Sequence, residues 1–191
     1  SRLVQKGYKV AIAEQMEDPK QAKGLVKREV IRVVTPGTLT NSQVLEESKN
    51  NYLMGIVYID GVFGVSTVDV STGDYLVTEV RNERSLLDEI YKFSPSELIC
   101  NEAFYMSGID LEDLKVRLNA VISALENRFF SDDSCRRILR EHFHVEHLEA
   151  LGLADYETGA IAAGAVLQYL YETQKNTLEH LTRLTVYTTG Q

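Results

Sequence analysis

The side chains best placed to do chemistry are cations close to the N-terminus. Lys23, Lys27, Arg28 and Arg32 form a basic run that is interrupted only by apolar residues and Glu29. Such cations bind the phosphates of nucleic acid by displacing counterions, and they position a duplex without reading its sequence. The alternative interpretation of the same run is a solvated strand edge that is guarded by charge.

Three aspartates would have to carry any metal-dependent hydrolysis. A two-metal nuclease holds its cations with carboxylates that cluster on adjacent strands. Asp60 lies in an expected turn, Asp69 ends an expected strand, and Asp74 lies in the following turn. The first strand has no acidic residue at its centre and no later partner is evident, so turn and capping roles are favoured and no metal site is expected.

The histidines and cysteines are a second set of residues whose side chains could bind a metal ion. His142, His144 and His147 lie close together in the sequence, but their spacing matches none of the structural zinc patterns. We expect them to face solvent or to interact with a helix dipole. Cys100 and Cys135 lack a CxxC spacing, so buried apolar roles are favoured over a disulfide, and the setting is expected to be reducing and cytoplasmic.

The composition limits the classes of function that the chain can perform. It has 191 residues, 44% of them hydrophobic and 25% charged, as in ordinary globular proteins. No apolar run approaches the roughly 20 residues that span a bilayer. The sequence contains no GxxxxGK[ST] phosphate loop, no GxGxxG and no GxSxG elbow, so we expect no catalytic residue and no bound cofactor.

The net charge of −8 is unevenly distributed along the chain. Residues 1–40 contain eight lysines or arginines and four acidic residues, whereas the remaining residues contain twelve and twenty-four. Only the first forty residues could therefore supply a basic surface for DNA. The remainder should repel nucleic acid at long range.

The elements that must position these residues follow from periodicity and turn chemistry. Alternation predicts two short strands near residues 8–12 and 28–34, and then a polar stretch over residues 36–51. A three-strand antiparallel meander is expected next, with turns at Asp60-Gly61 and at residues 71–74. Helices and strands then alternate: helix 86–93, strand 97–100, helix 111–118, strand 120–125, helix 132–143 and helix 156–174, with residues 177–187 extended.

The element order predicts an α/β fold. Three antiparallel strands are followed by helix-connected strands, and crossovers of this length imply that the later strands run parallel. This is the ribonuclease H-like arrangement. It is preceded by a partial α+β segment, because the two N-terminal strands need partners that the chain does not supply. We expect one apolar core, formed by Ile56, Tyr58, Val65, Val68, Val77, Leu87, Ile90, Ile99, Ile138 and Leu167.

Three groups of residues carry a resemblance to a known family. The first is the ordered series Gly7–Gln15 (GYKVAIAEQ), Glu17–Pro19 (EDP) and Lys23–Thr40 (KGLVKREVIRVVTPGTLT). The second is Asp69–Tyr75 (DVSTGDY), and the third is Ala162–Gln174 (AAGAVLQYLYETQ). In this order they resemble the mismatch-binding domain and the connector domain of the MutS family of DNA mismatch-repair proteins, over nearly the whole chain.

The resemblance implies an excised piece of a longer protein. Residues 1–40 would end the mismatch-binding domain, residues 41–51 would be a linker, residues 52–176 the connector domain and residues 177–191 the start of the core domain. The aromatic wedge motif with which MutS proteins read a mismatch, Phe-x-Glu, is absent from this sequence. This chain alone is therefore expected neither to detect a mismatch nor to hydrolyse ATP. ATP and Mg²⁺ would bind to another part of the parent protein.

The resemblance also implies partners and the residues that would meet them. The expected partners are a mismatched DNA duplex, MutL, other MutS domains and a second MutS subunit, with no membrane. Arg28 would be the main phosphate contact, with Lys27 and Lys23 weaker. Arg136 and Arg137, on the helix after Ser131, are candidates for MutL docking. A solvent-exposed helix surface without a partner would account for two adjacent arginines equally well. The alternatives are a ribonuclease H-like nuclease and an interaction module unconnected to DNA.

Overall fold

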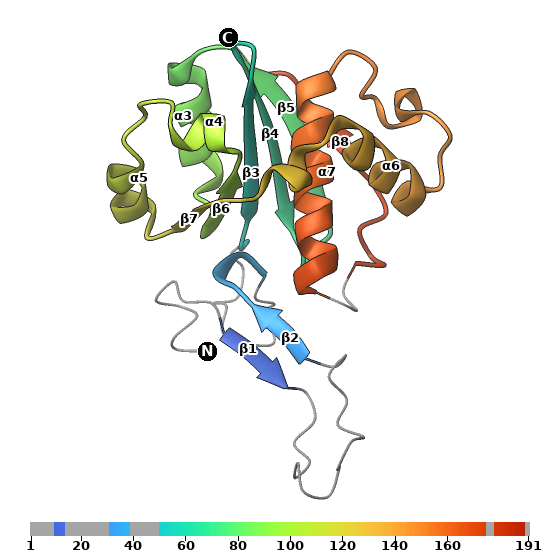
Figure 1. Cartoon of the computed structure of the whole chain (residues 1–191), viewed down its shortest axis with the longest axis horizontal. Helices are drawn as coiled ribbons and strands as arrows, with labels where there is room; N and C mark the ends of the chain where they lie inside the picture. Colours follow the sequence, from blue (N-terminus) through green and yellow to red (C-terminus); the bar gives the residue numbers. More distant parts are fainter. Residues whose placement is uncertain (1–9, 14–30, 39–49, 175–177, 190–191) are drawn as a thin grey trace, which may run out of the picture.

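The centre of the fold is the three-strand meander that the sequence predicts. This computed structural model describes residues 10–13, 31–38, 50–174 and 178–189 (Figure 1). Strands β3 (Leu53–Ile59), β4 (Val62–Asp69) and β5 (Asp74–Val80) pair antiparallel in sequence order. Asp60 and Gly61 both have positive φ, at 50° and 81°, as a two-residue type I′ turn requires.

Helical crossovers extend this meander into a mixed sheet. Helix α3 (Glu83–Phe93) leads to strand β6 (Glu97–Cys100), and helix α5 (Leu111–Leu118) leads to strand β7 (Val121–Ala124). β6 pairs with β3 and β7 pairs with β6, both in parallel, as predicted. The short strand β8 (Thr185–Val186) pairs in parallel with β5, which gives the order β7-β6-β3-β4-β5-β8.

Helices cover both faces of the sheet (Figure 1). Helices α3, α4 (Glu102–Tyr105) and α5 lie on one side, whereas α6 (Asp132–Phe143) and α7 (Glu157–Thr173) lie on the other. Two 3₁₀ turns, Asn127–Phe130 and Leu148–Leu151, flank α6. The single turn α4 was not predicted, because one helical turn is too short to show a 3.6-residue period. No helix among the described residues is long and apolar enough to cross a membrane.

Helix caps lie at the positions that their residue types predict. The hydroxyl of Ser131 accepts a hydrogen bond from the Ser134 amide at 3.5 Å, at the start of α6. Gly152 ends the second 3₁₀ turn with φ of 81°. These signals are local, so the sequence alone is enough to locate them.

The apolar interior is divided by the sheet, and the prediction of one core is therefore wrong. Both faces are covered, so successive side chains along a strand enter opposite clusters. Val68 packs with Leu53 and Leu167 under α7, whereas Val65 packs with Ile56 and Ile90 under α3. All ten predicted core residues lie in one or other cluster, with Tyr58, Leu87 and Ile138 only partly buried.

Helix α7 packs unusually close to its neighbours, because alanine and glycine occupy much of its length. A Cβ atom on Gly164 would lie 2.4 Å from Cys135 Cβ and 2.6 Å from its Cα atom, so α6 and α7 meet backbone to backbone. A Cβ atom on Gly64 of β4 would lie 2.3 Å from the Thr158 carbonyl oxygen. These approaches would be impossible with larger side chains.

The described N-terminal residues form a separate two-stranded sheet. Strand β1 (Val10–Ala13) pairs antiparallel with β2 (Ile31–Val34), which confirms that both predicted segments are strands. A 3₁₀ turn, η2 (Pro36–Thr38), follows β2 almost immediately. Figure 1 draws this turn against the lower end of the large sheet.

We expect Val68→Ala to lower the free energy of unfolding by about 1–3 kcal/mol, because Val68 is fully buried between Leu53 and Tyr75 on the neighbouring strands. Urea denaturation of the 191-residue chain measures the change. Val116→Ala is the matched control, since Val116 is 80% exposed on α5. Equal urea midpoints for Val68→Ala and the unchanged chain would show that β4 is placed in the wrong register.

Candidate functional site

The predicted phosphate contacts lie outside the described residues. Lys23, Lys27 and Arg28 belong to residues 14–30, which the structure does not describe. Their contact with DNA therefore stays a prediction.

The two predicted docking arginines differ in their surroundings on α6. The Nε atom of Arg136 lies 3.0 Å from the Asp132 carboxylate, one helical turn away, and its side chain is 35% exposed. Arg137 is exposed on the surface of the same helix. The predicted pair of solvent-facing cations is thus one paired arginine and one exposed arginine, and a role in docking stays a prediction for both.

The aspartates do not form a metal centre. Asp69 is buried, and its carboxylate accepts hydrogen bonds from the Asn51 amide at 3.2 Å, the Ser71 amide at 2.9 Å and the Ser71 hydroxyl at 2.8 Å. Asp60 is exposed in the turn after β3, whereas Asp74, predicted in a turn, is exposed as the first residue of β5. Across residues 10–13, 31–38, 50–174 and 178–189, no three histidine, cysteine or acidic side chains converge on one point. Asp69 has the turn-capping role that its position predicts.

The histidines near the end of α6 serve different purposes. Both ring nitrogens of His142 have partners at 2.7 Å, which are the Tyr171 hydroxyl and the Leu181 carbonyl oxygen. His144 is the left-handed C-cap residue of α6, and His147 precedes the next 3₁₀ turn. A cavity of about 530 Å³ lies beside His142 and is lined by residues from α6, α7 and the segment after it. His142 therefore connects α6 to α7 and to the segment that follows α7.

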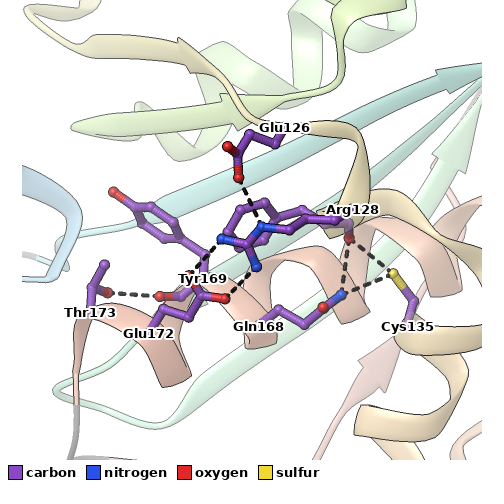
Figure 2. Close-up of polar contacts among 8 residues, drawn as sticks. Glu126, Arg128, Cys135, Gln168, Tyr169, Glu172 and Thr173 are labelled. Carbon is purple, nitrogen blue, oxygen red and sulfur yellow. Dashed lines mark hydrogen bonds and ion pairs between the residues drawn. The ribbon is translucent and has the colours of Figure 1, made fainter.

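The two cysteines are free and buried, as predicted. Burial raises the pKa of each thiol to about 12. The Cys135 thiol donates to the Phe129 carbonyl oxygen at 3.2 Å, and Gln168 of α7 reaches the same oxygen at 3.0 Å (Figure 2). Both cysteines are therefore packing residues with unreactive thiols.

A junction that the sequence did not reveal joins the N-terminal segment to the large sheet. Strand β2 continues into Thr35 and the turn Pro36–Thr38, and all four of these residues are buried. The polar composition of residues 36–51 predicts a solvated stretch, but Thr38 and Asn51, near its two ends, are instead buried and hydrogen-bonded, whereas Asn50 is exposed. This junction is the part of the described structure best suited to a function.

The centre of the junction is the carboxylate of Glu97, the first residue of β6. Glu97 is fully buried. One carboxylate oxygen accepts the Gly37 amide at 3.0 Å, and the other accepts the Tyr169 hydroxyl at 2.5 Å. A buried charge needs such donors to offset the loss of its hydration, so Glu97 ties the incoming turn to α7.

The turn has the internal bonds that let it enter the protein interior. The Thr38 amide donates to the Thr35 carbonyl oxygen at 3.1 Å, and the Thr35 amide donates to the Thr38 hydroxyl at 3.1 Å. Pro36 has no amide hydrogen to satisfy. A Cβ atom on Gly37 would lie 2.9 Å from Glu97 Cβ and 3.0 Å from Leu53 Cβ, so only glycine fits without movement.

Asn51 completes the junction from the other end of the polar stretch. Its side-chain amide donates to the Pro36 carbonyl oxygen at 2.6 Å, and its side-chain oxygen accepts the Ser96 hydroxyl at 2.6 Å. Its backbone amide donates to Asp69 at 3.2 Å. Two buried carboxylates, Glu97 and Asp69, therefore hold the two sides of the point where the chain enters the sheet.

The electrostatics of Tyr169 follow from this position. Burial raises the pKa of its hydroxyl, and the adjacent Glu97 charge and hydrogen bond raise it further, while a hydrogen bond with Thr35 opposes them. Tyr169 thus stays protonated and serves as a hydrogen-bond donor to Glu97.

The end of α7 next to Tyr169 is fixed at the surface by Arg128 (Figure 2). The guanidinium lies 2.7 Å from Glu172 of α7 and 2.8 Å from Glu126, which precedes the 3₁₀ turn Asn127–Phe130. Arg128 lowers the pKa of the Glu172 carboxyl, mainly through their hydrogen bond. Because the three side chains are exposed, this network contributes little to the stability of the fold.

A second tyrosine–carboxylate pair holds the segment that follows β8. The Tyr187 hydroxyl donates to the buried Glu89 of α3 at 2.6 Å, and its backbone amide donates to the Val77 carbonyl oxygen at 3.0 Å. The Thr78 hydroxyl donates to the Tyr187 carbonyl oxygen at 2.6 Å. Residues 177–191, predicted as the start of the next domain, therefore contribute a strand to this sheet in their described part.

The arrangement suits mechanical attachment at both ends of the domain. Tyrosine hydroxyls and buried carboxylates hold the incoming turn and the outgoing strand. Sequence reasoning missed both pairs because Glu97, Tyr169, Glu89 and Tyr187 lie far apart in the chain, and no spacing rule connects them. A glutamate at the start of an otherwise apolar four-residue strand was the one available signal.

Comparison with known proteins agrees with this two-part organisation. The family model of MutS domain I matches residues 1–43, and that of MutS domain II matches residues 51–182. Proteins named DNA mismatch repair protein MutS from Lachnoclostridium phytofermentans, Acetivibrio thermocellus and Protochlamydia amoebophila are 57%, 44% and 40% identical to the chain. These alignments cover 100%, 98% and 100% of the chain.

Two consecutive family domains, one on each side of the buried junction, define the chain as a two-domain segment. It belongs to the MutS family. The alignments cover 20%, 22% and 22% of the three relatives, so the chain spans about a fifth of their length.

Proposed function

We propose that this chain is the connector region of a MutS-type mismatch-repair protein, which links the mismatch-binding domain to the core domain and transmits conformational change between them. The observation that carries the proposal is the Glu97 junction, because it bonds the end of the domain I sequence to the domain II sheet. A coupling role needs rigid attachment at two sites and no catalytic residue. ATP and Mg²⁺ would bind to parts of the parent protein outside this chain.

The topology supports a finer assignment of the fold. From β3 to β7, the strands numbered in chain order lie as 3-2-1-4-5 across the sheet, with only the second antiparallel to its neighbours. We propose that this domain is ribonuclease H-like. The nuclease alternative finds little support, since Asp69 is occupied with backbone and hydroxyl groups. An interaction module unconnected to DNA finds no support in the names of the relatives.

If the connector transmits a signal, nucleotide added to the full-length protein should change hydrogen exchange at both attachments. The amides of Gly37 and Tyr187 report on the incoming turn and the outgoing strand. The amide of Val57, a fully buried residue of strand β3, serves as the internal control. Identical exchange at all three amides with and without nucleotide would contradict the coupling role.

We propose that DNA contact by this region is confined to residues 1–40, through Arg28 with weaker help from Lys27 and Lys23. In the full-length protein, Arg28→Ala should lower the affinities for matched and mismatched duplexes by a similar factor, because phosphate contacts carry no sequence information. It should also reduce the slope of log affinity against log salt concentration by about one unit. Fluorescence anisotropy at several salt concentrations measures both. Arg81→Ala, an exposed change in domain II, is the control. A loss confined to mismatched duplex would count against a phosphate contact.

We propose further that α6 contributes to a docking surface for MutL, with Arg137 as the exposed cation. Arg137→Glu should lower the affinity for MutL on the order of tenfold, because reversing an exposed interface charge adds repulsion. Surface plasmon resonance with the full-length protein measures the affinity. Arg84→Glu, on α3 across the sheet, is the matched control and should have no effect. Equal affinities of the two variants would remove α6 from the docking surface.

A further inference from the structure

We propose that domain II contains a binding site for the Thr35–Thr38 turn, and that this site, rather than the covalent segment of residues 39–49, fixes the domain I hairpin to the connector sheet. The inference rests on the proposed connector function and names the contact through which it would act. The ligand of the site is a segment of this chain, a buried Thr-Pro-Gly-Thr turn.

The site is formed by side chains from separate elements of domain II. Glu97 comes from β6, Tyr169 from α7, and Asn51 precedes β3. Each recognises a different polar group of the turn: the Gly37 amide, the Thr35 hydroxyl and the Pro36 carbonyl oxygen. Because donors and acceptors alternate around the turn, the site recognises its backbone conformation as well as its side chains.

The site also selects the turn by shape. Gly37 faces Glu97 and Leu53 so closely that a methyl group would overlap both. The Leu53 atom in this overlap is Cβ, which is bonded directly to the backbone of β3 and therefore does not move when the side chain rotates. A turn with any other residue at this position would have to shift away from Glu97 and Leu53.

The position of the turn in the chain makes the later segment dispensable for attachment. Thr35 directly follows Val34, the last residue of β2, so the hairpin and the turn move together. The path from β2 to the sheet through Glu97 contains no spacer. Since the entropy of closing a loop changes only logarithmically with its length, lengthening residues 39–49 should hardly weaken the attachment.

Hydrogen exchange of the Gly37 amide in the full 191-residue chain tests this inference. Inserting about ten glycine and serine residues between Leu45 and Glu46 should leave the exchange rate of Gly37 unchanged within about threefold, because the added length costs little. A rate that rises by a factor of ten or more on insertion, roughly the loss of one hydrogen bond to a charged group, would show that the covalent segment holds the turn and would overturn the inference.

Two substitutions should release the turn at either segment length. Tyr169→Phe removes a hydrogen-bond donor from Glu97, and Gly37→Ala introduces the overlap with Glu97 and Leu53. Each substitution should therefore speed hydrogen exchange of the amide at position 37 on the order of tenfold. Tyr187→Phe is the matched control, since it removes the same group from the buried Glu89 and should leave Gly37 unaffected. The Val57 amide reports whether each variant is still folded.

The outcomes separate this inference from the proposed function. Unchanged exchange at residue 37 in Gly37→Ala, in a chain whose Val57 amide stays protected, would overturn the binding site. Equal effects of Tyr169→Phe and Tyr187→Phe on Gly37 would also overturn it, because they would reflect general loosening. These measurements use neither nucleotide nor DNA, so the site could fail while the nucleotide response of the full-length protein still supports the connector role.

Discussion

The close approach of α7 to the sheet is the constraint on which most other contacts depend. Small residues let the helix lie against β3, β4 and β5, with Gly64 meeting the Thr158 carbonyl oxygen and Gly164 meeting Cys135. At this separation the buried Tyr75 hydroxyl reaches the Ala163 carbonyl oxygen at 2.7 Å. The same placement carries Tyr169 to Glu97. The helix position therefore decides both the packing under the sheet and the geometry of the junction.

Local patterns in the sequence were enough to predict much of the domain. The bounds of β6 and α5 agree with their predicted ranges, because buried four-residue runs and helical spacing are signals within one segment. The two-sided interior was missed, since counting apolar residues does not show which face of a strand each one occupies. The junction was missed for a related reason. Polar residues at 36–51 indicate a linker unless their partners are known, and those partners lie up to 60 residues away.

Prediction of the functional residues was limited in the same way, because the sequence shows local patterns but not contacts between distant residues. The basic run that contains Lys23, Lys27 and Arg28 is visible as a charge pattern, but a charge pattern does not show which of these side chains share a surface. For Arg136 and Arg137 the helix was predicted correctly, whereas the ion pair with Asp132 that distinguishes them needs side-chain geometry. Family resemblance rested on ordered motifs and was confirmed, because motif order is a property of the sequence itself.

The pairing of β8 with β5 has a consequence for the order in which the molecule assembles. Thr78 and Tyr187, which bond across this edge, are separated by 109 positions in the chain. On a ribosome, the meander leaves the exit tunnel long before its last neighbour is made. The outer edge of β5 therefore stays open while residues 81–184 are synthesised, and an open strand edge can pair with another nascent chain. Only when Thr185 and Val186 emerge is this edge closed, so the final strand protects the sheet as well as leading the chain out of it.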